Sequence, residues 1–168
     1  MGLVGCTIED FTGNPQKPLY DLGFAKDRIA AAAEAARKLQ FPFTLTARAE
    51  GFLRGSPDLD DILKRLQAFE AAGADVLMAP GLPDLASVQL VCAAISKPFN
   101  FMAGVRGRSF SVSELTNADV KRISLATSLY RAAMSGLVNA AREVKDEGSF
   151  GYVETTMATP ELNSFMSG

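Results

Sequence analysis

Charged side chains gather where two apolar segments of the sequence end. Glu9 and Asp10 close the first segment, and Arg48 and Glu50 close the second. Because side chains alternate between the two faces of a strand, Arg48 and Glu50 point the same way and are expected to lie beside Glu9. Carboxylates hold Mg²⁺ directly or through water, and a guanidinium binds a carboxylate or phosphonate with two hydrogen bonds. This cluster would suit the chemistry of a small anionic substrate.

Two further features add candidate residues. Asn100 is a polar residue inside the otherwise apolar run Pro98 to Met102. The connection Phe11 to Phe24 contains Lys17 and is long for a loop between a strand and a helix. Long loops in compact domains are often active-site lids, and a rigid surface excursion is the alternative.

The same residues allow a structural interpretation. Glu9 or Asp10 could simply pair with Arg48 in a salt-bridge network that caps the sheet. The glycine- and arginine-containing segment Gly104 to Arg108 resembles a phosphate-binding loop only weakly, because the Gly-Lys-Ser/Thr ending is missing. A basic surface loop is the simpler interpretation of that segment.

Composition excludes several function classes. The chain has 168 residues, 17 of them basic and 19 acidic, with a net charge of −2 and no histidine. Without histidine there can be no Ser-His-Asp or Cys-His nucleophile pair and no histidine metal ligand. The charge balance lacks the basic excess that nucleic-acid binding requires. No apolar run reaches the roughly 18 residues of a membrane span.

The two cysteines bear on the compartment. Cys6 and Cys92 both have apolar neighbours in the sequence. This favours buried thiols in a reducing cytoplasm over a disulfide. A cytoplasmic protein is expected, with neither nucleic acid nor a membrane as partner.

Short apolar runs alternate regularly with amphipathic segments, which predicts successive βα units and a parallel sheet. A helix from Asp58 to Ala72 is expected to be capped by Asp58 and ended by Gly73. A long final helix is expected from Ser128 to Asp146. The predicted strands are Leu3 to Ile8, Phe43 to Ala47, Asp75 to Ala79, Pro98 to Met102 and Val120 to Leu125, and the other helices are Ala25 to Leu39 and Pro83 to Ile95. An open doubly wound sheet and part of a (β/α)₈ barrel both fit this pattern.

Several motifs in order resemble the isocitrate lyase and phosphoenolpyruvate mutase superfamily. They are Gly5-Cys6-Thr7-Ile8-Glu9-Asp10, Ala47-Arg48-Ala49-Glu50-Gly51-Phe52, Ala71-Ala72-Gly73-Ala74-Asp75, Lys97-Pro98-Phe99-Asn100 and Val120-Lys121-Arg122-Ile123-Ser124. Each motif alone is weak, but together they extend over nearly the whole chain. The resemblance implies an α/β TIM barrel that binds Mg²⁺ and a 2-oxo acid or phosphonate. It also implies a C–C or P–C bond made or broken through an enolate-like intermediate.

The resemblance also implies roles for individual residues. Glu9 matches the acidic residue of the metal site, acting through metal-bound water, and Arg48 matches the arginine that holds the substrate. Arg48 and Glu9 are therefore catalytic candidates, and Lys17 of the long connection Phe11 to Phe24 is a third. The candidates for substrate binding are Arg48, Glu50, Asn100 and Asp10. The last helices imply a homo-oligomer, because family members commonly exchange them.

Three departures from the family pattern matter. The loop Phe11 to Lys17 lacks the cysteine of the lyase branch, which disfavours cleavage of isocitrate or methylisocitrate. Pro80 stands where relatives carry Glu or His. The Asp-x-Asp pair that supplies metal ligands in the family would precede the first motif. A full barrel takes about 250 residues, so roughly a third is expected to be missing.

The fold expected is therefore a partial (β/α)₈ barrel whose five parallel strands correspond to strands four to eight of the family. Residues 1–168 would form one N-terminally truncated domain, with βα units in 1–127 and C-terminal helices in 128–168. The expected function is a magnesium-dependent lyase or phosphonomutase. The alternative is a non-catalytic remnant or a structural subunit that depends on association. A flavodoxin-like nucleotide-binding domain is a third possibility, disfavoured by the lack of a phosphate-binding glycine pattern.

Overall fold

A parallel sheet organises the first part of the chain. The computed structural model describes residues 2–167, and within them five strands lie in the order β1-β2-β3-β4-β5, every neighbouring pair parallel. The strands are β1 (Gly5–Glu9), β2 (Thr44–Arg48), β3 (Val76–Met78), β4 (Phe99–Met102) and β5 (Arg122–Ser124). The strand order never reverses, as it would in a doubly wound sheet. The flavodoxin-like alternative is therefore wrong.

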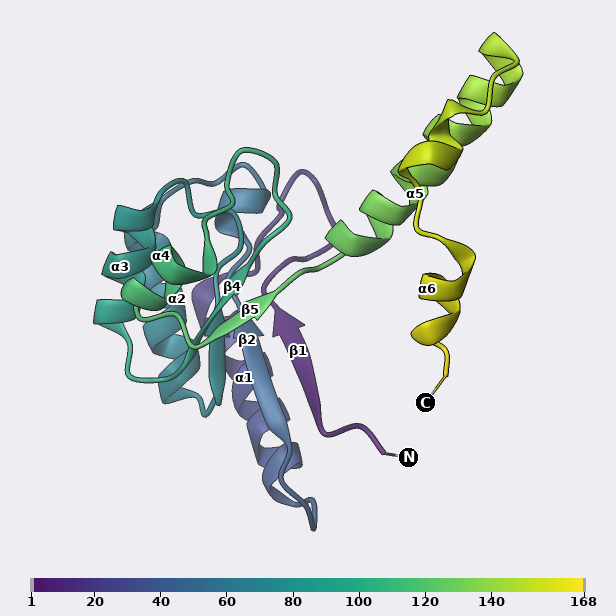
Figure 1. Cartoon of the computed structure of the whole chain (residues 1–168). Helices are drawn as coiled ribbons and strands as arrows, with labels where there is room; N and C mark the ends of the chain where they lie inside the picture. Colours follow the sequence, from purple (N-terminus) through teal and green to yellow (C-terminus); the bar gives the residue numbers. More distant parts are fainter. Residues whose placement is uncertain (1, 168) are drawn as a thin grey trace. The chain divides into compact units, whose positions relative to one another are not determined.

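Helices connect the strands. They are α1 (Leu22–Arg37), α2 (Leu59–Ala71), α3 (Leu85–Ala94) and α4 (Val112–Asn117). Right-handed crossovers in a sequential sheet place such helices on one face of it, and α2, α3 and α4 gather on one side of the sheet in Figure 1. The α2 prediction is confirmed: the Asp58 carboxylate accepts hydrogen bonds from the backbone of Asp60 and Asp61, and Gly73 has a φ of 102°. The short α4 was not predicted.

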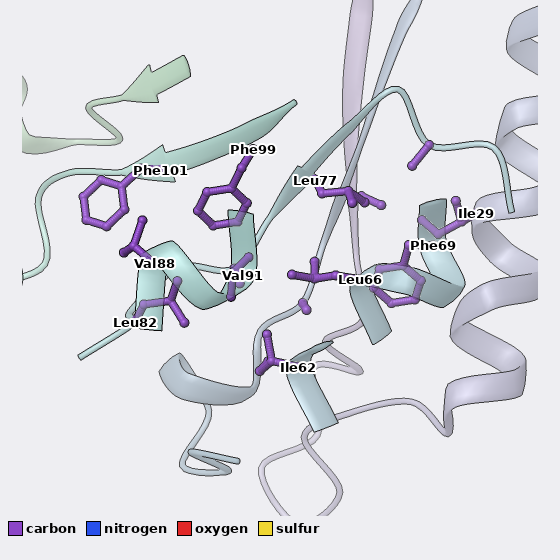
Figure 2. Packing of buried hydrophobic residues seen from close by; sticks show 14 of the residues in the cluster. Ile29, Ile62, Leu66, Phe69, Leu77, Leu82, Val88, Val91, Phe99 and Phe101 are labelled. Carbon is purple, nitrogen blue, oxygen red and sulfur yellow. The ribbon is translucent and has the colours of Figure 1, made fainter. Parts of the chain in front are cut away.

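The hydrophobic core lies between the sheet and its helices. Alternate residues of the strands point into it, among them Leu45, Leu77 and Phe99, each no more than 1% exposed. Figure 2 shows this packing, with Ile62, Leu66 and Phe69 of α2 and Val88 and Val91 of α3 against the strands. The other strand residues therefore point to the opposite face of the sheet, which carries polar side chains.

The segment from Thr127 onward forms a second compact unit, separate from the unit that ends at Ala126. It contains α5 (Ser128–Arg142), a π-helical turn (Glu143–Glu147), a 3₁₀ turn (Gly151–Thr155) and α6 (Thr159–Ser164). Gly148 ends the π-helical turn in a left-handed conformation, with a φ of 64°. Many of the unit's apolar side chains are exposed, including Leu129, Leu137, Phe150, Leu162 and Phe165.

The prediction that both thiols are buried is wrong for Cys6. The Cys6 side chain is exposed, whereas Cys92 is partly buried. Cys6 lies in β1, an edge strand that has β2 on one side and no second neighbour among residues 2–167. Among the same residues, no helix has the length and apolar character needed to cross a membrane.

Candidate functional site

One row of side chains crosses the sheet from edge to edge. Glu9 of β1 lies in register with Arg48 of β2, which lies in register with Met78, then Asn100 and finally Arg122 of β5. All five residues line one hollow of about 290 Å³ on the face away from the core. The predicted proximity of Glu9, Arg48 and Asn100 is thus confirmed, because parallel pairing sets their register.

Arg48 provides an accessible guanidinium in this row. Its Nε lies 3.5 Å from Oε2 of Glu9 and donates a hydrogen bond to Oε1 of Glu50. The Arg48 side chain remains 20% exposed, while that of Glu9 is 38% exposed. Arg48 can therefore contact a ligand in the hollow while the Glu50 carboxylate fixes its Nε.

Glu50 is the carboxylate behind Arg48, and its side chain is fully buried. The 3₁₀ turn Gly51–Leu53 folds the chain back so that Arg54 Nη2 lies 2.8 Å from Glu50 Oε2. This tight turn depends on glycine, since a Cβ at Gly51 would lie 2.9 Å from the carbonyl oxygen of Ser56. Each carboxylate oxygen of Glu50 thus accepts from a different arginine, Arg48 or Arg54.

Asp10 points away from the hollow. Its buried carboxylate accepts a hydrogen bond from the Glu50 backbone N–H at 2.8 Å and from Arg65 Nη1 at 3.2 Å. Burial raises the pKa of Asp10, although these two hydrogen bonds and the charge of Arg65 lower it in part. These contacts give Asp10 a positioning role at the strand ends, so its predicted substrate contact stays a prediction.

Asn100 is buried in the floor of the hollow. Its Nδ2 donates a hydrogen bond to Ser124 Oγ at 3.0 Å. Its Oδ1 is a buried side-chain atom with no hydrogen-bond partner among the described residues. Buried amides normally satisfy both ends. This amide therefore has hydrogen-bonding capacity left over at the base of the hollow.

Sequence reasoning missed Arg122 and Ser124 as lining residues. Arg122 is exposed, and no carboxylate in residues 2–167 forms an ion pair with it. The motif Val120-Lys121-Arg122-Ile123-Ser124 could have indicated both residues, because alternation along β5 puts Arg122 and Ser124 on one face. The hollow is therefore lined by two guanidiniums, those of Arg48 and Arg122, and by one carboxylate, that of Glu9. This arrangement can bind an anion.

Lys17 lies outside the hollow. Its Nζ pairs with Asp21 at 2.9 Å, and both side chains are well exposed. The loop around it is closed by a bridge between Phe11 and Leu19 and by a hydrogen bond from the Thr12 N–H to the Pro18 carbonyl. The catalytic role of Lys17 stays a prediction. In the segment from Gly104, Arg108 donates to the Gly81 carbonyl.

The described residues do not by themselves form a magnesium site. No group of three or more acidic, cysteine or histidine side chains gathers among them with the geometry to hold a metal. Glu9 is the one carboxylate that lines the hollow in this part of the chain. Asp10 and Glu50 are held by arginines instead. Glu9 could therefore be at most one ligand, direct or through water.

Comparison with known proteins gives consistent matches. Residues 1–145 match the family model of phosphoenolpyruvate phosphomutase. A crystal structure of a candidate lyase/mutase from Burkholderia cenocepacia J2315 is 42% identical, with a TM-score of 0.93 over 98% of this chain and 59% of that chain. The 2-methylisocitrate lyase of Escherichia coli K12 is 28% identical over 94% of this chain and 55% of its own length.

A further match is phosphonopyruvate hydrolase, solved in complex with oxalate and Mg²⁺. It is 18% identical, with a TM-score of 0.75 over 98% of this chain and 59% of that chain. At this identity the likeness shows a shared fold. The chain spans about half the length of the curated relatives it matches.

Proposed function

Because the chain belongs to the phosphoenolpyruvate phosphomutase family, within the phosphoenolpyruvate mutase and isocitrate lyase superfamily, we propose that it serves a lyase or phosphonomutase reaction. The substrate would be a 2-oxo acid or a related carboxylate or phosphonate. A C–C or P–C bond beside the carboxylate would be made or broken through an enolate-like intermediate. The observation that carries this proposal is the row from Glu9 to Arg122, which lines one hollow with two guanidiniums.

In this proposal Arg48 binds the anionic group of the substrate with paired N–H donors. Arg122 faces the same hollow and would stabilise negative charge that develops on a substrate oxygen. Asn100, at the floor, would help orient the substrate. Mg²⁺ is the proposed cofactor on the strength of the family and of the relative solved with Mg²⁺. Of the described residues, Glu9 alone offers a carboxylate toward it from the hollow.

The proposed architecture is the part of a (β/α)₈ barrel that holds strands four to eight. Sequential parallel strands with helices on one face support it, because a barrel wall is built this way. The 0.93 TM-score over 59% of a longer relative also supports it. In a closed barrel the polar face of the sheet would line the interior.

The second unit supports a proposed homo-oligomer. Its helix α5 has no buried residue, and apolar side chains such as Leu129 and Leu137 are exposed. Exposed apolar surface of this kind often marks a protein interface. Self-association through residues 128–168 would cover it.

A structural role without catalysis is the second candidate. The observation that favours it is the buried network itself, because Asp10 and Glu50 are fully occupied by Arg65, Arg48 and Arg54. Such a network could stabilise the strand ends with no ligand. Under this alternative Arg48 would contribute to folding and to nothing else.

Titration calorimetry with oxalate in the presence of Mg²⁺ separates the two candidates. Oxalate mimics an enolate, so the protein should bind it, and Arg48→Ala should weaken binding by at least about tenfold while remaining folded. Arg37→Ala is the matched control, since Arg37 pairs with Asp75 at the opposite end of the sheet. Oxalate binding that survives in Arg48→Ala, or no binding by the wild type, would contradict the proposed function.

A further inference from the structure

Glu50 divides one negative charge between two arginines. Its Oε1 accepts from Arg48 Nε, and its Oε2 accepts from Arg54 at 2.9 Å from Nε and 2.8 Å from Nη2. The Glu50 side chain is fully buried, so water cannot replace either partner. The two arginines are therefore coupled through one carboxylate, although only Arg48 lines the hollow.

Arg54 is itself held in place from the other side. Its guanidinium carbon lies 3.6 Å from the centroid of the Phe11 ring, within the range of a cation–π contact. Phe11 is fixed in turn by its bridge to Leu19, and the Tyr20 N–H donates to the Asp10 carbonyl next to it. The Arg54 guanidinium thus forms an ion pair with Glu50 through its N–H groups and packs its planar face against Phe11, at the base of the 11–19 loop.

We propose that Arg54 is a positioning residue for the anion-binding site: it holds the buried Glu50 carboxylate so that Glu50 orients Arg48 without neutralising it. The inference rests on the proposed role of Arg48 and goes beyond it, because Arg54 is not among the residues that line the hollow. Arg54 also connects the site to the loop that follows β1.

The charges of Arg48, Glu50 and Arg54 predict how loss of Arg54 changes anion binding. With Arg54 present, Glu50 lies between two positive charges, and Arg48 keeps most of its attraction for an anion. Without Arg54, the full negative charge of Glu50 offsets the positive charge of Arg48 and weakens the attraction of Arg48 for an anion. We therefore expect loss of the Arg54 charge to weaken anion affinity about tenfold. Oε2 of Glu50, which Arg54 holds, would then also be available to bind Arg48.

A measurement without ligand tests the positioning directly. The Arg48 Nε–H signal can be followed by nuclear magnetic resonance, and in Arg54→Gln we expect its exchange with water to be at least about fivefold slower, because the whole Glu50 charge then strengthens the hydrogen bond that Arg48 Nε donates. Arg28→Gln is the matched control, because Arg28 also lies over an aromatic ring, that of Tyr20, and donates to the Glu9 carbonyl but does not touch Glu50. An Arg48 signal unchanged in Arg54→Gln, or equally changed in Arg28→Gln, would overturn the proposal.

Oxalate affinity with Mg²⁺ provides the second measurement. We expect Arg54→Gln to weaken it about tenfold, and Arg54→Lys, which keeps the charge but loses the paired N–H donors and the contact with Phe11, to recover part of that loss. In a Glu50→Gln background, Arg54→Gln should weaken binding no further. A folded Arg54→Gln variant with unchanged oxalate affinity would overturn the proposal. If the wild type binds no oxalate, the proposed function fails, while the Arg48 signal still decides the role of Arg54.

Discussion

The carboxylate of Asp10 accepts a hydrogen bond from the backbone N–H of Glu50 at 2.8 Å, which ties the end of β1 to the end of β2. The second oxygen of Asp10 meets Arg65 of α2. Arg65 also donates to the carbonyl of Tyr20, just before α1. Asp10 therefore fixes the place where Glu50, and through it Arg48, enters the candidate site.

Replacing Arg65 by methionine should destabilise the protein strongly. The change leaves the Asp10 carboxylate buried without its cation and also removes the bond to Asp61. Breaking a buried ion pair from one side costs about 3–5 kcal/mol, so we expect about 3 kcal/mol less unfolding free energy in urea. Arg37→Met, which breaks the more exposed pair with Asp75, should cost about 1 kcal/mol or less. Equal losses in the two variants would contradict the role given to Arg65.

Asp10→Asn should change how stability depends on pH. Burial raises the pKa of Asp10 above its ordinary 3.8, so the folded protein holds this proton more tightly than the unfolded chain does. As pH rises above 3.8 and through the raised pKa, the wild type therefore loses stability at this position. Asparagine cannot titrate, so the stability deficit of Asp10→Asn should shrink as pH rises from 3.8 through the raised pKa. Urea unfolding of both proteins across this range checks it, and a deficit that grows with pH would contradict it.

Much of the fold was predictable because apolar alternation reports local structure directly. Each predicted strand overlaps an observed one, and the capping aspartate and the final glycine of α2 lie where expected. Helix α4 was missed even though Ser111 and Glu114 form a capping box. It has six residues, too few to show a helical period, and it depends on burial of Leu115 against the rest of the core.

The candidate site was predictable only in part. Alternation along β2 correctly put Arg48 and Glu50 together, and parallel pairing brought Glu9 to them. The partner of Asp10 was not predictable, because Arg65 is 55 residues away in the chain and reaches the strand end only through packing of α2. Arg54 was missed for a similar reason, since a turn, not a strand, returns it to Glu50.

The two thiols should differ in reactivity. Burial raises the pKa of Cys92 to about 11, and the thiolate is the reactive form. Cys6 is exposed on the edge strand. With iodoacetamide at about pH 8, Cys6 should therefore react at least about tenfold faster than Cys92, as read by mass spectrometry of the labelled peptides. In denaturant the two rates should become similar, whereas comparable rates in the folded protein would show that Cys92 is accessible.

Glu143 should stabilise the 3₁₀ turn Gly151–Thr155 of the second unit. Its carboxylate accepts hydrogen bonds from the Ser149 hydroxyl at 2.7 Å and from the backbone N–H groups of Gly151 and Tyr152. The Ser149 hydroxyl, followed by these N–H groups, lowers the pKa of Glu143 below its ordinary 4.5. The stability it contributes is therefore present above that pH and is lost as pH falls through the lowered value.

Glu143→Ala should accordingly speed hydrogen exchange at the amides of Gly151 and Tyr152 at neutral pH, because both lose their acceptor. Glu147→Ala, at an exposed position in the same π-helical turn, is the control and should leave these amides unchanged. Amide exchange followed by nuclear magnetic resonance gives the comparison residue by residue. If Gly151 and Tyr152 exchange equally fast in the wild type and in Glu143→Ala, another contact holds the turn. If Glu147→Ala speeds them as much, the effect comes from net charge instead of the hydrogen bonds.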